Sequence, residues 1–173
     1  YVLMSGTSMA TPQIAGAMAV LMQYLRQNYP QYQEAELRQV AANLMMSTAD
    51  PILDSNGLEV SPRGQGAGLA NLVKATSSLA YLSNAQAYEN RAKAELGDDP
   101  ERTGTYDFSF TLYNLTEEEQ TYDLSVDLFT QDVYHEDQAS YMDTITTPLL
   151  TSALWTVDGK PLHPGQGQPD FDG

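Results

Sequence analysis

A serine in surroundings that suit nucleophilic chemistry stands near the start of the sequence. It is Ser8, in the stretch SGTSMATPQIAG over residues 5–16. A serine hydroxyl is a weak nucleophile until a base removes its proton and hydrogen-bond donors stabilise the oxyanion that forms. Gly6 allows a tight backbone turn beside a substrate, and a Ser8 N–H at the start of a helix can donate to an oxyanion. Ser8 is therefore a candidate nucleophile. The alternative is that it only caps the helix, a position that serine favours.

The element that must position Ser8 is a helix predicted over residues 9–28, with its N-terminus at Thr7 to Met9. Apolar residues cover nearly its whole circumference, which is typical of a buried helix. Pro12 is tolerated in the first turn of a helix, and we expect it to lie there and to help fix Ser8. An amphipathic second helix is predicted over Glu34–Met46. A glycine-rich loop over residues 61–68, whose glycines indicate close backbone packing, leads into a short helix over 69–79.

After Asn84 the hydrophobic period changes from helical to two. Alternation over residues 106–113 and 122–129 predicts two antiparallel strands joined by a polar loop over 114–120, and we expect a further short strand at 92–96. Short strands with charged outer faces are typical of a β-sandwich of immunoglobulin or fibronectin type III character. The stretch over 148–173 is rich in Pro and Gly and shows little strand pattern.

The distribution of charge also divides the chain. The 173 residues include 8 basic and 23 acidic side chains, a net charge of -15, and no cysteine. Residues 1–85 carry a net charge of only about -1, and the remaining residues carry about -14. An acidic surface repels nucleic acid and anionic membranes, and no apolar run is long enough to cross a bilayer. We therefore expect neither a nucleic-acid partner nor membrane insertion of this segment.

Two stretches of the sequence resemble one family of enzymes, the subtilases, or subtilisin-like serine peptidases. GTSMATP followed by QIAGAMAVL is similar to their nucleophile-serine segment, and SPRGQGAGLANLVKA over residues 61–75 is similar to their last loop and closing helix. Gln13 departs from a histidine common in the family, which is not catalytic. The positions that fit are Gly6, Thr7, Ser8, Met9, Ala10, Thr11, Pro12, Ala15 and Gly16.

The resemblance implies an α/β fold class in two parts. Residues 1–84 would be the C-terminal portion of a subtilisin-like catalytic domain, mostly its helices. Residues 85–173 would be a partial, all-β, fibronectin type III-like sandwich with an acidic tail rich in Pro and Gly. A β-domain directly after the closing helix is similar to the cell-envelope branch of the family, which includes the lactocepins and the streptococcal complement-cleaving peptidases. That branch implies an extracellular location at the bacterial cell wall or surface.

The resemblance also implies a chemistry. A member of this family would be a serine endopeptidase that acts on proteins through an acyl-enzyme on Ser8. Gly6 and Thr7 would shape the substrate and oxyanion loop, and catalysis would require no cofactor or metal. Subtilases order their triad Asp, His, Ser. We therefore expect the Asp and His before residue 1, in the rest of the same polypeptide, and expect this piece alone to be inactive. His135 and His163 are expected to be surface residues.

Three alternatives stay open at this point. Gly6-x-Ser8-x-Ala10 is close to the G-x-S-x-G elbow of α/β-hydrolases, which would use His135 or His163 as the base but needs a strand before the serine. The parent protein could also be a non-catalytic cell-surface binding or adhesin scaffold derived from a subtilase. Finally, residues 170–173, Asp-Phe-Asp-Gly, either begin a calcium-binding module or are an acidic linker.

Overall fold

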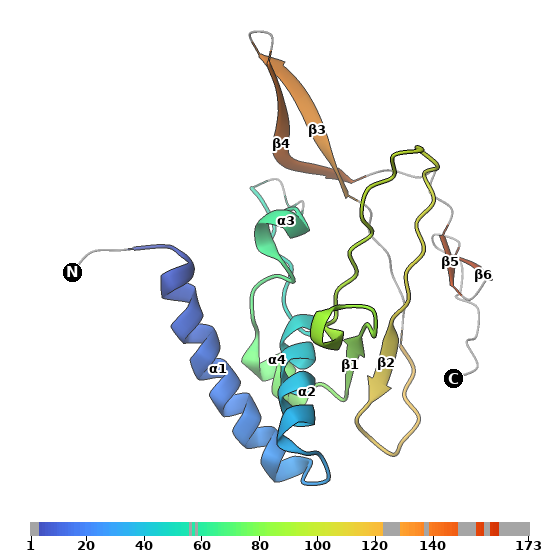
Figure 1. The fold of residues 1–173 in the computed structure, drawn as a ribbon. Coiled ribbons are helices and arrows are strands. Elements are labelled where there is room, and N and C mark those ends of the chain that lie inside the picture. Colours follow the sequence, from blue (N-terminus) through green and yellow to red (C-terminus); the bar gives the residue numbers. More distant parts are fainter. Residues whose placement is uncertain are drawn as a thin grey trace. The chain divides into compact units, whose positions relative to one another are not determined.

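The computed structural model describes residues 4–55, 57, 59–122, 129–136, 139–148, 155–157 and 160–162 (Figure 1). The helices are α1 (Thr7–Asn28), α2 (Glu34–Ser47), α3 (Pro62–Gln65), α4 (Leu72–Ser77) and the 3-10 helix η1 (Tyr88–Asn90). The strands are β1 (Ala80–Ser83), β2 (Thr111–Asn114), β3 (Phe129–Glu136), β4 (Ala139–Pro148), β5 (Trp155–Val157) and β6 (Lys160–Leu162). The chain divides into two compact units. One comprises Tyr1–Pro51 with Ala67–Glu118, and the other Ile52–Gly66 with Glu119–Gly173.

Helices α1 and α2, both predicted from their apolar spacing, form an antiparallel hairpin (Figure 1). At the turn, the guanidinium of Arg26 donates to both carboxylate oxygens of Glu34, at 2.6 and 2.9 Å, and this contact lowers the pKa of Glu34. The N–H of Gln33 donates to the Glu36 carboxylate at 2.7 Å, which completes a capping box at the start of α2. The hairpin core is a set of buried residues to which α4 and β1 also contribute: Leu21, Met22, Leu25, Leu37, Val40, Ala41, Leu44, Met45, Ala75 and Tyr81.

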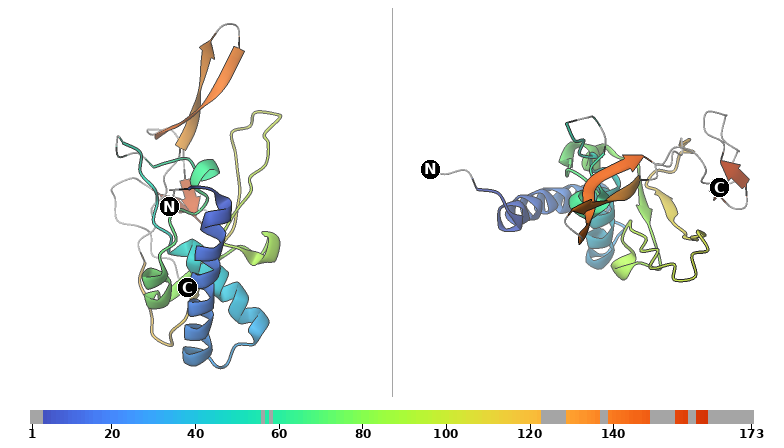
Figure 2. Two further views of the ribbon diagram at one scale, coloured as in Figure 1. Left: turned by 90° about the vertical axis from the view of Figure 1, so that its left-hand side faces the viewer. Right: turned by 90° about the horizontal axis from the view of Figure 1, so that it is seen from above.

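The prediction that α1 is buried along its length is wrong for its N-terminal half. Its buried residues are Leu21, Met22 and Leu25, whereas Met9 is 37% exposed and Ile14 is 43% exposed. An apolar circumference requires neighbours on every side. Among the described residues, α2 and α4 contact α1, and its N-terminal end projects away from both of them (Figures 1 and 2).

A two-stranded antiparallel sheet lies against α2. It pairs β1 with β2 in the register Ala80↔Asn114 to Ser83↔Thr111. The rings of Tyr81 and Tyr113 stack with their centroids 5.0 Å apart, and burial raises the pKa of Tyr81 to about 12. The strand predicted over residues 106–113 is thus confirmed only from Thr111 onward, and the strand predicted at 92–96 is absent. The strand expected to pair with residues 106–113 is the one predicted over 122–129. Most of that segment, residues 123–128, lies outside the described residues.

The second unit contains two antiparallel hairpins, β3 with β4 and β5 with β6. The sequence pattern predicts neither hairpin, and β5 and β6 lie in the stretch expected to have little strand structure. Every sheet in the described part of the chain has two strands. The predicted helices α1 and α2 are therefore confirmed, and they occur together with small two-stranded sheets. The fibronectin type III-like sandwich and the domain boundary at residue 84 stay predictions.

A backbone contact in the first unit joins the end of α2 to the start of α4. Asp50 and Leu69 exchange two N–H···O=C bonds of 2.8 and 2.7 Å. Gly68 has φ +116°, and a Cβ there would stand 2.4 Å from the Asp50 carbonyl oxygen, so the predicted close backbone packing is confirmed at this glycine. The Asp50 carboxylate accepts hydrogen bonds from Asn71 at 2.8 Å and from Lys74, which together hold its pKa below the ordinary value.

Gly68→Ala should destabilise the protein by about 2 kcal/mol or more, because the added methyl group overlaps backbone atoms and the φ angle strains any L side chain. The matched control is Gly16→Ala in α1, where a Cβ meets nothing within 4 Å. That change should stabilise the helix by about 0.5–1 kcal/mol. Urea unfolding of both variants measures the difference, and equal effects would contradict the close contact.

Asp50 should also contribute to acid sensitivity. Because its folded pKa is lowered, the stability it contributes is complete above its unfolded pKa of about 4 and is lost as the pH falls through its folded pKa. Asp50→Asn should therefore be less stable than the parent at pH 7, with the gap narrowing below about pH 4. Thermal unfolding of both proteins across this range measures the gap. A constant gap would show that the carboxylate charge has no part in the contact.

Candidate active site

The candidate nucleophile Ser8 is the second residue of α1, which begins at Thr7, within the predicted range. Gly6 is the N-cap, with φ 154° and ψ 166°, a region of backbone conformation almost confined to glycine. Its carbonyl oxygen accepts hydrogen bonds from the N–H groups of Met9 at 3.0 Å and Ala10 at 3.1 Å. The sequence therefore places Gly6 where the chain must turn sharply into the helix.

The hydroxyl of Ser8 does not cap the helix. The cap position belongs to Gly6, the helix has no side-chain cap hydrogen bond, and Ser8 is exposed. The reading of Ser8 as a helix cap is thus wrong. Its N–H lies in the first turn, where the helix geometry offers no internal acceptor, at the positive end of the helix dipole. The exposed hydroxyl and this N–H together suit a group that attacks a carbonyl and then holds the resulting oxyanion.

Pro12 lies deeper in the helix than predicted. It is inside α1 at the sixth position, beyond the first turn. Proline has no N–H, so the Ser8 carbonyl lacks the donor that residue 12 would otherwise supply to it. Nearby, the Thr11 hydroxyl donates to the Thr7 carbonyl at 2.7 Å. The turn that carries Ser8 is therefore held by one backbone hydrogen bond fewer than an ordinary helix.

The described part of the chain does not supply a base for Ser8. Neither histidine is among the residues whose side chains the structure describes: His135 is placed only as backbone in β3, and His163 lies outside the described residues. Their expected surface positions stay predictions. The strand required by the α/β-hydrolase alternative is absent from Met4 to Gly6, and Tyr1 to Leu3 are outside the description. Gly6 and Thr7 lie beside Ser8 as the resemblance implies, but their role toward a substrate is untested.

Neither a cluster of metal ligands nor a membrane-spanning helix occurs within the described ranges. No group of three or more His, Asp or Glu side chains there could hold a metal ion. No helix there is long and apolar enough to cross a membrane. Asp170 and Asp172, the start of the predicted calcium loop, lie outside the description, so that prediction is untested.

Comparison with known proteins identifies the first part of the chain. Residues 1–68 match the subtilase family. The chain is 38% identical over 144 residues to the PII-type proteinase of Lacticaseibacillus paracasei, which covers 78% of this chain and 8% of that protein. It is 29% identical over 121 residues to a C5a peptidase of Streptococcus pyogenes serotype M6, covering 69% of this chain and 10% of that protein. It is 28% identical over 164 residues to a C5a peptidase of serotype M1, covering 94% and 12%.

These matches confirm the resemblance to the subtilases and to the predicted branch of the family. The match over residues 1–68 includes Ser8, α1 and α2. The chain spans only 8–12% of the length of these relatives.

Pro12→Ala should strengthen the turn that carries Ser8, because residue 12 then donates an N–H to the Ser8 carbonyl and the ring no longer crowds that oxygen. The gain in helix stability is up to about 3 kcal/mol, the usual cost of an interior proline. Amide exchange across residues 9–16 of the 173-residue chain should slow, while exchange at Leu44 in α2 stays the same. Faster exchange across residues 9–16 would show that the proline stabilises this turn.

Proposed function

We propose that the subtilase segment of this chain, residues 1–68, supplies the nucleophile of a serine endopeptidase that cleaves proteins. The observation that carries the proposal is the placement of Ser8: an exposed hydroxyl in the first turn of α1, next to a glycine cap, within the match to the subtilase family. The relatives named as proteinases and peptidases support the same chemistry.

In this mechanism the Ser8 Oγ attacks the carbonyl carbon of the substrate while a histidine takes the hydroxyl proton. The Ser8 N–H donates to the oxyanion of the tetrahedral intermediate, and Gly6 and Thr7 border the substrate. The C–N bond then breaks, the amine leaves with the proton, and the acyl group remains as an ester on Ser8. Water hydrolyses the ester and returns the proton to Ser8 through the same histidine.

The proposal requires further residues of the parent protein. The triad Asp and His come before Tyr1, in the order that subtilases use. The exposed apolar face of α1, which includes Met9, Ile14 and Val20, supports this requirement, because a catalytic helix needs neighbours that hold it in place. The 173-residue chain by itself should then have no peptidase activity.

The remaining assignments follow from the branch of the family. Residues 85–173 begin a fibronectin type III-like domain, and the parent lies outside the cell at the cell wall or surface. The branch of C5a peptidases and lactic acid bacterial proteinases supports this location. Catalysis needs no cofactor, and any calcium bound near Asp170 serves structure and not the reaction. A net charge of -15 opposes binding to nucleic acid.

Ser8→Ala in the full-length parent should lower kcat by about 10⁴-fold or more while leaving the fold intact, because the acyl-enzyme can no longer form. The matched control is Ser77→Ala, an exposed serine in α4, which should keep parental turnover. Hydrolysis of a protein substrate measures turnover, and a fluorophosphonate that labels activated serines should modify the parent and not Ser8→Ala. Turnover retained by Ser8→Ala would remove Ser8 from the mechanism. An unlabelled, inactive parent would favour the binding scaffold instead.

A further inference from the structure

One polar side chain of α2 is fully buried. Asn43 of α2 has 0% exposed surface, although its neighbours on that face of the helix are the buried Val40 and Leu44. A buried amide is costly unless all of its hydrogen bonds are made. The position of Asn43 therefore requires specific partners nearby.

Both partners of Asn43 lie almost 50 residues further along the chain. Its Nδ2 donates to the Asn90 carbonyl at 3.0 Å, and its Oδ1 accepts from the Ala92 N–H at 3.0 Å. The Ser83 hydroxyl of β1 donates to the same Asn90 carbonyl at 2.9 Å. One side chain of α2 thus satisfies backbone groups on both sides of Arg91.

The backbone that Asn43 holds is in an unusual conformation. Glu89 and Asn90 have φ angles of 53° and 50°, in the left-handed region that non-glycine residues rarely adopt. Such residues cost free energy and persist where surrounding contacts hold them. The two donors that meet at the Asn90 carbonyl provide such contacts.

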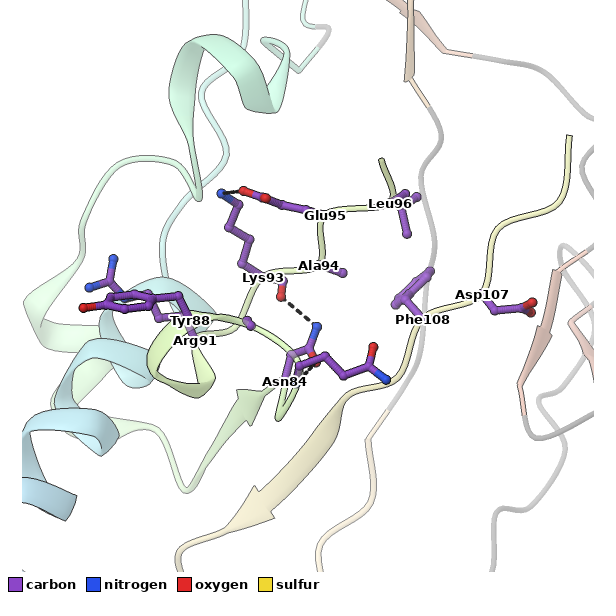
Figure 3. Close-up of a pocket in the computed structure, with 11 residues that line it drawn as sticks. Asn84, Tyr88, Arg91, Lys93, Ala94, Glu95, Leu96, Asp107 and Phe108 are labelled. Atoms are coloured by element: carbon purple, nitrogen blue, oxygen red, sulfur yellow. Dashed lines mark hydrogen bonds and ion pairs between the residues drawn. The ribbon is translucent and has the colours of Figure 1, made fainter. Parts of the chain in front are cut away.

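A second asparagine, Asn84, joins the two ends of the same segment by hydrogen bonds. Asn84, 5% exposed, donates from its Nδ2 to the Lys93 carbonyl at 2.8 Å, and its N–H donates to the Arg91 carbonyl at 3.2 Å (Figure 3). The segment also forms one wall of a pocket of about 320 Å³, opposite Leu96 and Phe108. We call residues 84–93 the connector, because they lead from β1 into the acidic half of the chain.

We propose that Asn43 acts as a buried latch: its two hydrogen bonds fix the connector to α2. The connector then unfolds only together with the helix hairpin and not as an independent loop. The proposal does not depend on peptidase activity, because it concerns only contacts between α2, β1 and the connector. Since α2 also packs against α1, the latch makes the connector part of the folded body from which the Ser8 helix extends.

Amide hydrogen exchange of the 173-residue chain tests the latch directly. In the unaltered protein the Ala92 N–H should exchange within about tenfold of the Leu44 N–H in α2, since both open with the hairpin. Exchange of Ala92 at the rate of an unstructured chain would overturn the proposal.

Variants then test whether Asn43 is responsible. Asn43→Ala should speed exchange at Ala92 about tenfold or more relative to Leu44, because the acceptor of the Ala92 N–H is gone. The matched control is Arg38→Ala on the same helix, whose exposed guanidinium bonds to the Glu34 carbonyl of its own helix and which should leave Ala92 unchanged. Equal acceleration at Ala92 and Leu44 in Asn43→Ala would mean that Asn43 only stabilises the core, and would overturn the latch.

Ser83→Ala is the milder variant, because it removes one of the two donors to the Asn90 carbonyl and keeps Asn43 in place. It should speed exchange at Ala92 by about threefold while Leu44 is unaffected. No change at Ala92 would show that the Ser83 hydroxyl has no part in holding the connector and that Asn43 alone holds it.

Discussion

Leu21 and Leu25 of α1 pack against Leu37, Val40 and Leu44 of α2, and the other elements of the first unit depend on this contact. Full burial of such a side chain contributes about 1.5–3 kcal/mol, so a few leucines account for most of what holds two helices together. Helix α4 adds Ala75 to this core, and β1 adds Tyr81. The hairpin is therefore the surface on which the short helix and the small sheet form, since a two-stranded sheet is only marginally stable alone.

Polar groups determine where the chain goes after this core is complete. The Asp50–Leu69 bridge joins the ends of α2 and α4, and Gly68 is required because backbone atoms stand where a side chain would begin. Asn43 directs the connector in the same way, through two hydrogen bonds from one buried amide. Apolar contacts are not directional, whereas each of these hydrogen bonds accepts only one arrangement of its partners. The apolar core supplies stability, and the buried polar groups determine the course of the backbone around it.

The sequence predicted what is local and missed what depends on distant partners. Apolar spacing located α1 and α2 to within a residue or two, and the stretch around Gly6 and Ser8 located the candidate nucleophile. Alternation over residues 106–113 predicted a strand but did not indicate that it pairs with β1, a segment for which the sequence predicted no element. The one signal for the connector was an asparagine between Val40 and Leu44 on an apolar helix face, and such a residue identifies no partner 50 positions away.

The part of α1 with the fewest contacts is the part that contains the candidate nucleophile Ser8. Its fully buried residues begin only at Leu21, with Ala17 and Met18 partly buried against the core, and Pro12 removes a hydrogen bond beneath Ser8. A helical segment without tertiary contacts is marginal in water, so the turn around Ser8 needs packing against the exposed apolar face beside it. A nucleophile requires its geometry fixed within a fraction of an ångström. The contacts that cover Ile14 and Val20 would therefore do two things at once: complete the folding of α1 and set the position of the Ser8 hydroxyl. A serine on such a helix becomes a catalyst only when its helix is enclosed.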